Sequence, residues 1–292
     1  MLIVLLYIAL FARFSFVAHE NSLWMILVGL GGIGVGAICW WFFITFVVST
    51  LRKWFNIRGT YLLNRIIGSL IVCLSVVGQM KKLNVPYLET LDVLSLSAAA
   101  SLLQDKGRKG EIDSLNWAEY PYRPEVSFFI GRTNLRLYIN YVVKGNSLKA
   151  SYGKDGSPVY QDSCVEFFMQ QEGEKIYRNF EFNCIGTCDA SRRRSRTEKE
   201  SLTPEEYAGI RRYSSIGDQP FEEKEGLYTW SLLVAIPFST MDLDPGNLPE
   251  KIRANFYKCA DETKYPHFLS WNPIDLPKPD FHCPPFFGEL FL

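Results

Sequence analysis

Apolar and polar positions follow two different patterns along this 292-residue chain. Residues 21–51 contain no charged side chain, and a helix needs roughly 20 apolar residues to cross the hydrocarbon core of a bilayer. Leu2–Val17 and Leu62–Met80 are two further apolar runs that are long enough, or nearly so. Because only a helix satisfies the backbone of such a segment in lipid, the pattern predicts two or three transmembrane helices within residues 1–82.

Basic residues indicate how these helices are oriented. Four of them lie in or beside the loop between the second and third apolar runs: Arg52, Lys53, Arg58 and Arg65. Short loops rich in lysine and arginine stay in the cytoplasm. We therefore expect a multi-pass membrane protein, in contact with membrane lipid, whose remaining chain lies on the extracytoplasmic side.

The period of the pattern changes to two from about Pro121. Residues 126–143 alternate as two strands around a turn at Thr133-Asn134, as in a hairpin. Further short strands are expected at 164–169, 178–183, 229–236, 251–258 and 286–292. Many short strands separated by turn residues predict an all-β sandwich over residues 117–292.

Other segments do not fit the strand pattern. Residues 83–116 are predicted to be a linker that contains a helix-compatible run, Ser95–Gln104. Pro204–Gly209 is compatible with a short helical turn. The charged run Arg192–Glu200 is interpreted as a solvated loop, with a polyanion-binding patch as the less favoured alternative.

The net charge is informative only when residues 1–79 and 80–292 are considered separately. The 31 basic and 31 acidic residues cancel over the whole sequence, and the mean hydropathy is −0.00. However, residues 1–79 hold five basic residues and one acidic residue, which leaves 26 basic and 30 acidic residues in 80–292. A positively charged apolar anchor is thus joined to a negatively charged soluble part. Neither part has the strong positive field expected of a nucleic-acid-binding protein.

Catalytic motifs are missing from the sequence. It contains no nucleophile elbow, zinc-protease motif or phosphate-binding loop, and residues 80–292 hold only two histidines. Asp280, His282 and Cys283 do not have a zinc-ligand spacing relative to Cys259. Cys184 and Cys188 are compatible with a disulfide or with two reduced thiols. The sequence therefore favours a binding protein rather than an enzyme.

Some aromatic residues stand next to polar groups, as in proteins that bind sugars. Aromatic rings cover the apolar face of a sugar, while carboxylates and arginine bond its hydroxyl rim. Tyr160 precedes Glu166 by six residues, and Trp271 lies in a Ser-Trp-Asn-Pro segment. For each aromatic residue, packing in the core is the alternative.

Residues 80–292 resemble the carbohydrate-binding module family 9 proteins. The resemblance includes MKKLNVPYLETLD at 80–92, NWAEYPYRPEVSFFI at 116–130 and SPVYQDSCVEFF at 157–168. It implies a non-catalytic β-sandwich that binds an oligo- or polysaccharide, with a link to polysaccharide catabolism and an accessory role beside glycoside hydrolases. It also implies a structural Ca²⁺, for which the sequence identifies no ligands.

The resemblance assigns four sugar-contacting residues. Tyr160 corresponds to the first clamp aromatic, which is usually tryptophan in the family, and Glu166 to the adjacent carboxylate. Arg178 corresponds to the arginine that contacts sugar, and Trp271 to the second aromatic.

Residues 1–82 resemble the C-terminal helices of LysE-type amino-acid exporters, through a glycine-rich helix, a basic loop and NRIIGSLIVCLSVVG at 64–78. The N-terminal half of that family has no counterpart here. This resemblance gives an alternative function, an exporter fragment fused to an accessory domain. The two parts join at Gln79/Met80, either as a genuine fusion or because a truncated exporter reading frame runs into its neighbour.

Overall fold

The computed structural model describes residues 36, 38–46, 49 and 80–292, and the chain divides into two compact units, Met1–Leu74 and Ser75–Leu292. In the first unit the described residues are helical, and the Thr45 hydroxyl donates to the Trp41 carbonyl at 2.7 Å. Within the described residues, no helix is both long enough and apolar enough to cross a bilayer. Most of the predicted membrane segments and their connecting loop lie outside the described residues.

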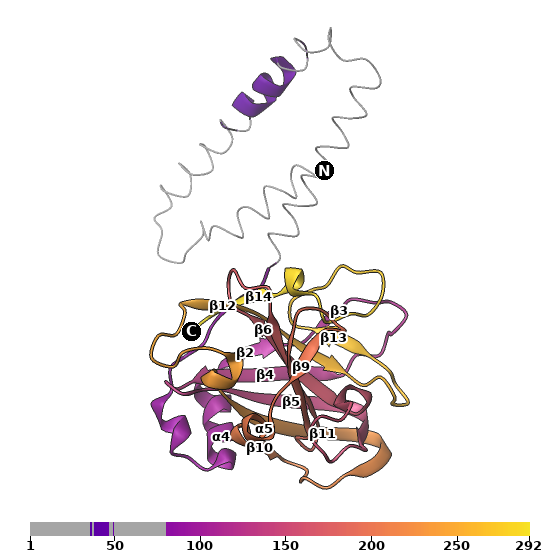
Figure 1. Cartoon of the computed structure of the whole chain (residues 1–292). Helices are drawn as coiled ribbons and strands as arrows, with labels where there is room; N and C mark the ends of the chain where they lie inside the picture. Colours follow the sequence, from indigo (N-terminus) through magenta and orange to yellow (C-terminus); the bar gives the residue numbers. More distant parts are fainter. Residues whose placement is uncertain (1–35, 37, 47–48, 50–79) are drawn as a thin grey trace. The chain divides into compact units, whose positions relative to one another are not determined.

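The second unit consists of two β-sheets packed face to face (Figure 1). The larger sheet has the order β1-β14-β12-β6-β7-β8-β9, with β13 and β3 continuing from β12. Its strands are antiparallel except for the parallel pair β1–β14. They are β1 (Lys82–Asn84), β3 (Ser114–Leu115), β6 (Cys164–Gln170), β7 (Tyr177–Asn183), β8 (Cys188–Arg193), β9 (Lys199–Ser201), β12 (Lys251–Cys259), β13 (Phe268–Ser270) and β14 (Gly288–Phe291).

The smaller sheet has the order β10-β11-β5-β4-β2 and is antiparallel throughout. Its strands are β2 (Arg108–Glu111), β4 (Glu125–Arg132), β5 (Arg136–Ala150), β10 (Arg211–Ser214) and β11 (Phe221–Pro237). Short 3-10 turns connect strands at η1 (Glu89–Asp92), η2 (Val159–Gln161), η3 (Phe238–Met241) and η4 (Pro284–Phe286). The predicted β-sandwich and its first hairpin are therefore confirmed.

The main core lies between the two sheets. Along β6 the odd-numbered residues Val165, Phe167 and Met169 belong to this core, because successive side chains of a strand point to opposite faces. The even-numbered residues Cys164 and Phe168 belong to a second apolar cluster on the outer face of the larger sheet. This second face is covered by the loop that precedes β14 and carries the candidate site.

The segment predicted as a linker is part of the sandwich. β1 pairs with β14 and β2 pairs with β4, so residues 83–116 contribute to both sheets. Helix α4 (Leu96–Lys106) begins where Ser95 accepts a hydrogen bond from the Ala98 amide, and its buried face packs on the smaller sheet. The linker prediction is wrong because the strands within it are too short to show a period of two, whereas the predicted helix is confirmed.

The other irregular segments also have a defined structure. α5 (Pro204–Gly209) begins with a capping box between Thr203 and Glu206, which confirms the predicted helical turn. The charged run at 192–200 is not a solvated loop along its whole length, since it includes the end of β8 and the start of β9. Cys184 and Cys188 are free thiols.

Candidate functional site

A cleft of about 590 Å³ opens on the outer face of the larger sheet. Strands β6, β7 and β8 form its floor, and residues from the η2 turn and from the 278–282 loop form its walls. Its lining combines acidic, basic and aromatic side chains, which is typical of a site for a polar ligand.

Three carboxylates form a row across the floor. Glu166 of β6 is the register partner of Glu181 of β7, which in turn is the partner of Asp189 of β8. All three residues are buried, with exposed fractions of 2%, 4% and 6%. Burial raises the pKa of Glu166 well above its usual value, and burial together with the charge of Asp189 raises the pKa of Glu181 to about 8.

Basic residues border this row on one side. Arg193 is held in place by two hydrogen bonds, from Nε to the Asn179 side chain and from Nη1 to the Arg196 carbonyl, both 2.7 Å long. The Lys199 ammonium lies 3.6 Å from an Asp189 oxygen. The floor therefore offers hydrogen-bond acceptors and donors side by side, in fixed positions.

Aromatic side chains form the walls. Tyr160, in the η2 turn, is 39% exposed. Tyr120 and Phe268 contact each other edge to face, with ring centroids 4.7 Å apart. The His282 Nδ1 atom and the Tyr177 hydroxyl form a hydrogen bond of 3.0 Å. Burial lowers the pKa of His282 to about 3, so the imidazole is neutral at physiological pH.

Of the four residues predicted to contact sugar, the structure places Tyr160 and Glu166 together in this cleft. Arg178 and Trp271 do not line it. Arg178 pairs in register with Met169, whose side chain is in the core between the sheets. The Arg178 side chain therefore points to the face of the sheet opposite Glu166.

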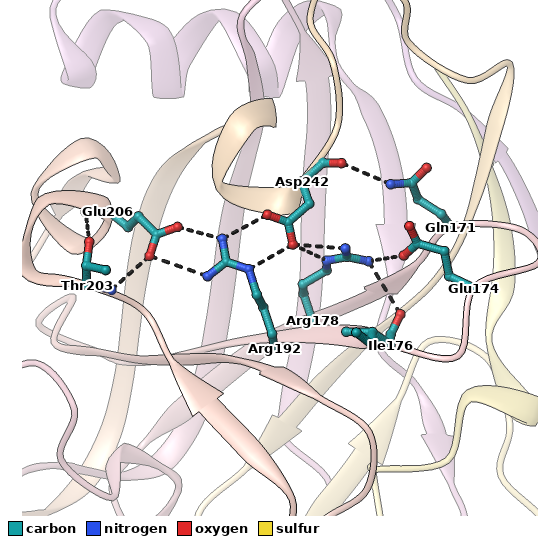
Figure 2. A network of polar contacts seen from close by, with 8 residues as sticks. All are labelled: Gln171, Glu174, Ile176, Arg178, Arg192, Thr203, Glu206 and Asp242. Carbon is teal, nitrogen blue, oxygen red and sulfur yellow. Dashed lines mark hydrogen bonds and ion pairs between the residues drawn. The ribbon is translucent and has the colours of Figure 1, made fainter.

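Arg178 is part of an ion-pair network at the corner of the sandwich (Figure 2). Its guanidinium bonds Glu174 at 2.6 Å and Asp242 at 2.9 Å. Arg192, its register partner on β8, bonds the same Asp242 and also Glu206. We call these five residues the corner clamp. All three guanidinium nitrogens of Arg178 are used within it, and the residue is 4% exposed, so a sugar contact by Arg178 is not supported.

Trp271 is a core residue. It is 3% exposed and packs edge to face against Phe256 and Phe128, with centroid distances of 5.6 and 6.3 Å. Its polar neighbours bond inside the protein: the Ser270 hydroxyl donates to the Asn272 carbonyl, and the Asn272 amide donates to Asn255 Oδ1. A sugar contact by Trp271 is therefore not supported, and the packing alternative is the better interpretation.

Most residues of the cleft are not predicted from the sequence. Glu181, Asp189 and Arg193 belong to it, as do Tyr120 and Phe268. The alternation along β7 indicates that Glu181 and Arg178 face opposite ways, but not which of them faces the ligand. That choice depends on the register with β6, which is set by long-range pairing.

One group of metal-ligating side chains is present among the described residues. Cys164, Glu166 and Cys259 have ligand atoms within 4.8 Å of one another. Two of these three atoms are sulfur, whereas Ca²⁺ takes oxygen ligands, so this group does not fit calcium. The expectation of a structural calcium stays a prediction without assigned ligands.

Comparison with known proteins agrees with this architecture. The family model described as "Carbohydrate-binding family 9" matches residues 97–292. A crystal structure of a candidate carbohydrate-binding protein from Bacteroides uniformis is 37% identical, with a TM-score of 0.69, over 73% of this chain and 99% of that one. Family 9 modules from Caldicellulosiruptor kristjanssonii, solved with glucose and with cellotriose, are 12% identical with a TM-score of 0.46, over 72% of this chain and 95% and 93% of theirs. No match was found among curated proteins.

A two-sheet sandwich with a cleft on one outer face thus defines the class of this protein as a β-sandwich binding module. More specifically, the chain belongs to carbohydrate-binding family 9, because the family model covers most of its length. The comparisons give no support for the exporter resemblance of residues 1–82.

Proposed function

We propose that this protein binds an oligo- or polysaccharide, without cleaving it, in the cleft on the outer face of the larger sheet. The observation that carries the proposal is the combination, in one cleft, of an exposed tyrosine ring with a row of buried carboxylates. A sugar ring presents an apolar face to the aromatic ring and a rim of hydroxyls to the polar groups.

Each wall of the cleft has a distinct role in this proposal. Tyr160 stacks on one sugar face, and the Tyr120–Phe268 pair supplies the second aromatic surface in place of Trp271. Glu166 and Glu181 bond hydroxyl groups, and the Arg193 guanidinium donates to ring or hydroxyl oxygens. Because these polar groups are buried before the ligand arrives, little ordering is needed on binding.

The proposal extends to attachment of the module to a membrane and to a role in polysaccharide catabolism. Attachment rests on the uncharged run at 21–51, which is long enough to span a bilayer. Cells that express the full chain can be lysed and their membranes extracted with alkaline carbonate. We expect the protein to stay in the membrane pellet, and its release into the supernatant would contradict attachment.

Sugar binding can be tested by calorimetric titration of the full chain with a panel of cello-, xylo- and other oligosaccharides. We expect at least one sugar to bind, and Tyr160→Ala to weaken it roughly tenfold, about 1.4 kcal/mol. Tyr213→Ala removes a comparably exposed tyrosine from β10 of the other sheet, and is expected to leave binding unchanged. Absence of binding to every sugar, or equal affinity of the Tyr160→Ala variant and the wild type, would overturn the proposal.

A further inference from the structure

Two thiols and a carboxylate meet at the floor of the cleft. Cys164 and Cys259 are register partners on the adjacent strands β6 and β12. Glu166 lies two residues further along β6, so its side chain is on the same face of the sheet as both thiols. The three residues are buried, with exposed fractions of 0%, 1% and 2%.

The distances between these side chains match those between the ligands of a tetrahedral metal. The Glu166 Oε1 atom lies 3.0 Å from Cys259 Sγ and 3.9 Å from Cys164 Sγ. With Zn–S bonds of about 2.3 Å and Zn–O bonds of about 2.1 Å, the sulfur–oxygen edge of a tetrahedron is about 3.6 Å. The observed distances lie on either side of this value, and all three ligand atoms lie within 4.8 Å of one another. Small rotamer adjustments are therefore enough to bring them around one ion.

The charge of the surroundings also suits such a site. A divalent ion bound by two thiolates and one carboxylate leaves a net charge of −1. Lys258 is 2% exposed, and its ammonium donates to the Cys259 carbonyl at 2.6 Å. No carboxylate lies within 4.0 Å of it in the part of the chain that the structure describes. Lys258 pairs in register with the core residue Val165, so it approaches the cluster from the other face of the sheet, and its positive charge offsets part of the net negative charge of the metal-bound group.

The site has an open side. Glu166 and Cys259 both line the cleft, so an ion can enter from solvent and keep one coordination position for water. We propose that Cys164, Cys259 and Glu166 bind one thiophilic divalent cation, of which Zn²⁺ is the prime example. Binding requires both thiols as thiolates and Glu166 as a carboxylate, and it releases to solvent every proton that these three groups carried. Glu166 is shared with the proposed sugar contacts but the two thiols are not, so cation binding can be tested with no sugar present.

Cobalt(II) is a suitable probe because thiolate ligands give it a strong charge-transfer absorption and tetrahedral geometry gives it intense visible bands. The full chain, reduced and freed of metal, is titrated with Co²⁺ in the absence of sugar. We expect both absorptions to grow and saturate at one ion per chain, and one equivalent of Zn²⁺ to abolish them. A wild-type chain that shows no charge-transfer band overturns the proposal without the use of any variant.

Variants then locate the site. Cys164→Ser and Cys259→Ser are each expected to lose most of the charge-transfer intensity, and Glu166→Gln to weaken Co²⁺ binding at least tenfold. Cys188→Ser is the matched control, because Cys188 is an equally buried free thiol in the same sheet outside the cluster. Intensity that persists in Cys164→Ser and Cys259→Ser, or falls equally in Cys188→Ser, would contradict the assignment. Failure here leaves the sugar titration unaffected, so the two proposals can fail separately.

Discussion

The two faces of the larger sheet carry charged side chains in different ways. At the edge of the inner face, the corner clamp alternates acid and base, with each guanidinium shared between two carboxylates. On the outer face, Glu166 and Glu181 have no basic partner within 4.0 Å among the described residues. The ion pairs of the corner clamp join β7 and β8 to α5 and to the turn after η3, whereas carboxyl groups without a basic partner remain available to a ligand.

Mutations on the two faces should therefore have different effects on stability and on binding. Changes on the inner face should reduce stability and affect binding only through folding. Changes on the outer face should alter binding with little loss of stability.

The largest effect is expected for Trp271→Ala. Removal of this ring leaves a cavity beside Phe256 and Phe128, and should lower the free energy of unfolding by about 3–5 kcal/mol. Urea unfolding followed by circular dichroism measures the change. Tyr213→Ala, at an exposed position, should change it by no more than about 0.5 kcal/mol. A loss of less than about 1 kcal/mol in Trp271→Ala would mean that Trp271 is not a core residue.

Asp242→Asn tests the corner clamp. Asp242 adopts a left-handed backbone conformation (φ 56°) that asparagine also tolerates, so the substitution removes mainly the charge between Arg178 and Arg192. We expect a loss of about 2–3 kcal/mol in unfolding free energy, less than for a fully buried pair because the Asp242 side chain is 34% exposed.

The control for this variant is Glu198→Gln, which breaks an exposed pair with Arg194. Exposed pairs contribute little, so a change below about 0.5 kcal/mol is expected. Equal effects of Asp242→Asn and Glu198→Gln would show that the corner clamp does not stabilise the sandwich.

Glu181→Gln tests the middle carboxyl group of the cleft floor through the pH dependence of stability. The pKa of Glu181 is raised to about 8 in the folded protein from an ordinary value of 4.5. Between these values the folded state keeps a proton that the unfolded state has lost, so Glu181 makes the wild type less stable as pH rises. The slope is at most about 1.4 kcal/mol per pH unit for one group.

Glutamine cannot ionise, so Glu181→Gln should gain stability relative to the wild type between pH 5 and pH 8. Thermal unfolding at both pH values measures this gain. A stability difference between the two proteins that is the same at pH 5 and pH 8 would show that Glu181 is not held protonated.

The smallest effect is expected for Tyr160→Trp. An indole presents a larger face to a sugar than a phenol does, and should tighten binding by about 0.5–1 kcal/mol, a factor of about 2–5. Tyr160→Phe keeps the ring face and should bind nearly as well as the wild type. Calorimetry with the sugar identified in the panel measures these affinities. Weaker binding by Tyr160→Trp than by the wild type would contradict stacking on this ring.

Sequence patterns predicted the parts of this fold that depend on local order. The alternation in 126–143 gave the first hairpin, and the polar start of 95–104 gave the helix. Tyr160 and Glu166 are also local to each other, because the η2 turn leads directly into β6. Their shared location in the cleft follows from a short connection.

The remaining site residues depend on pairing between distant strands. Glu181 rather than Arg178 faces the cleft because of the register between β7 and β6. Arg193 is in a charged run that composition alone assigns to solvent. Trp271 has polar neighbours, yet Ser270 bonds to Asn272 and Asn272 bonds to Asn255 inside the protein, which lets the ring enter the core. A single sequence contains no signal for any of these three arrangements.

The most direct test of the account is hydrogen–deuterium exchange of the full chain with and without the sugar that binds. Segments 156–163 and 278–283 contain residues that line the cleft, whereas segments 171–176 and 238–244 contain residues of the corner clamp. Sugar binding in the cleft should slow exchange in the first two segments and leave the last two unchanged. Protection confined to 171–176 and 238–244, or none in 156–163 and 278–283 at saturating sugar, would contradict it.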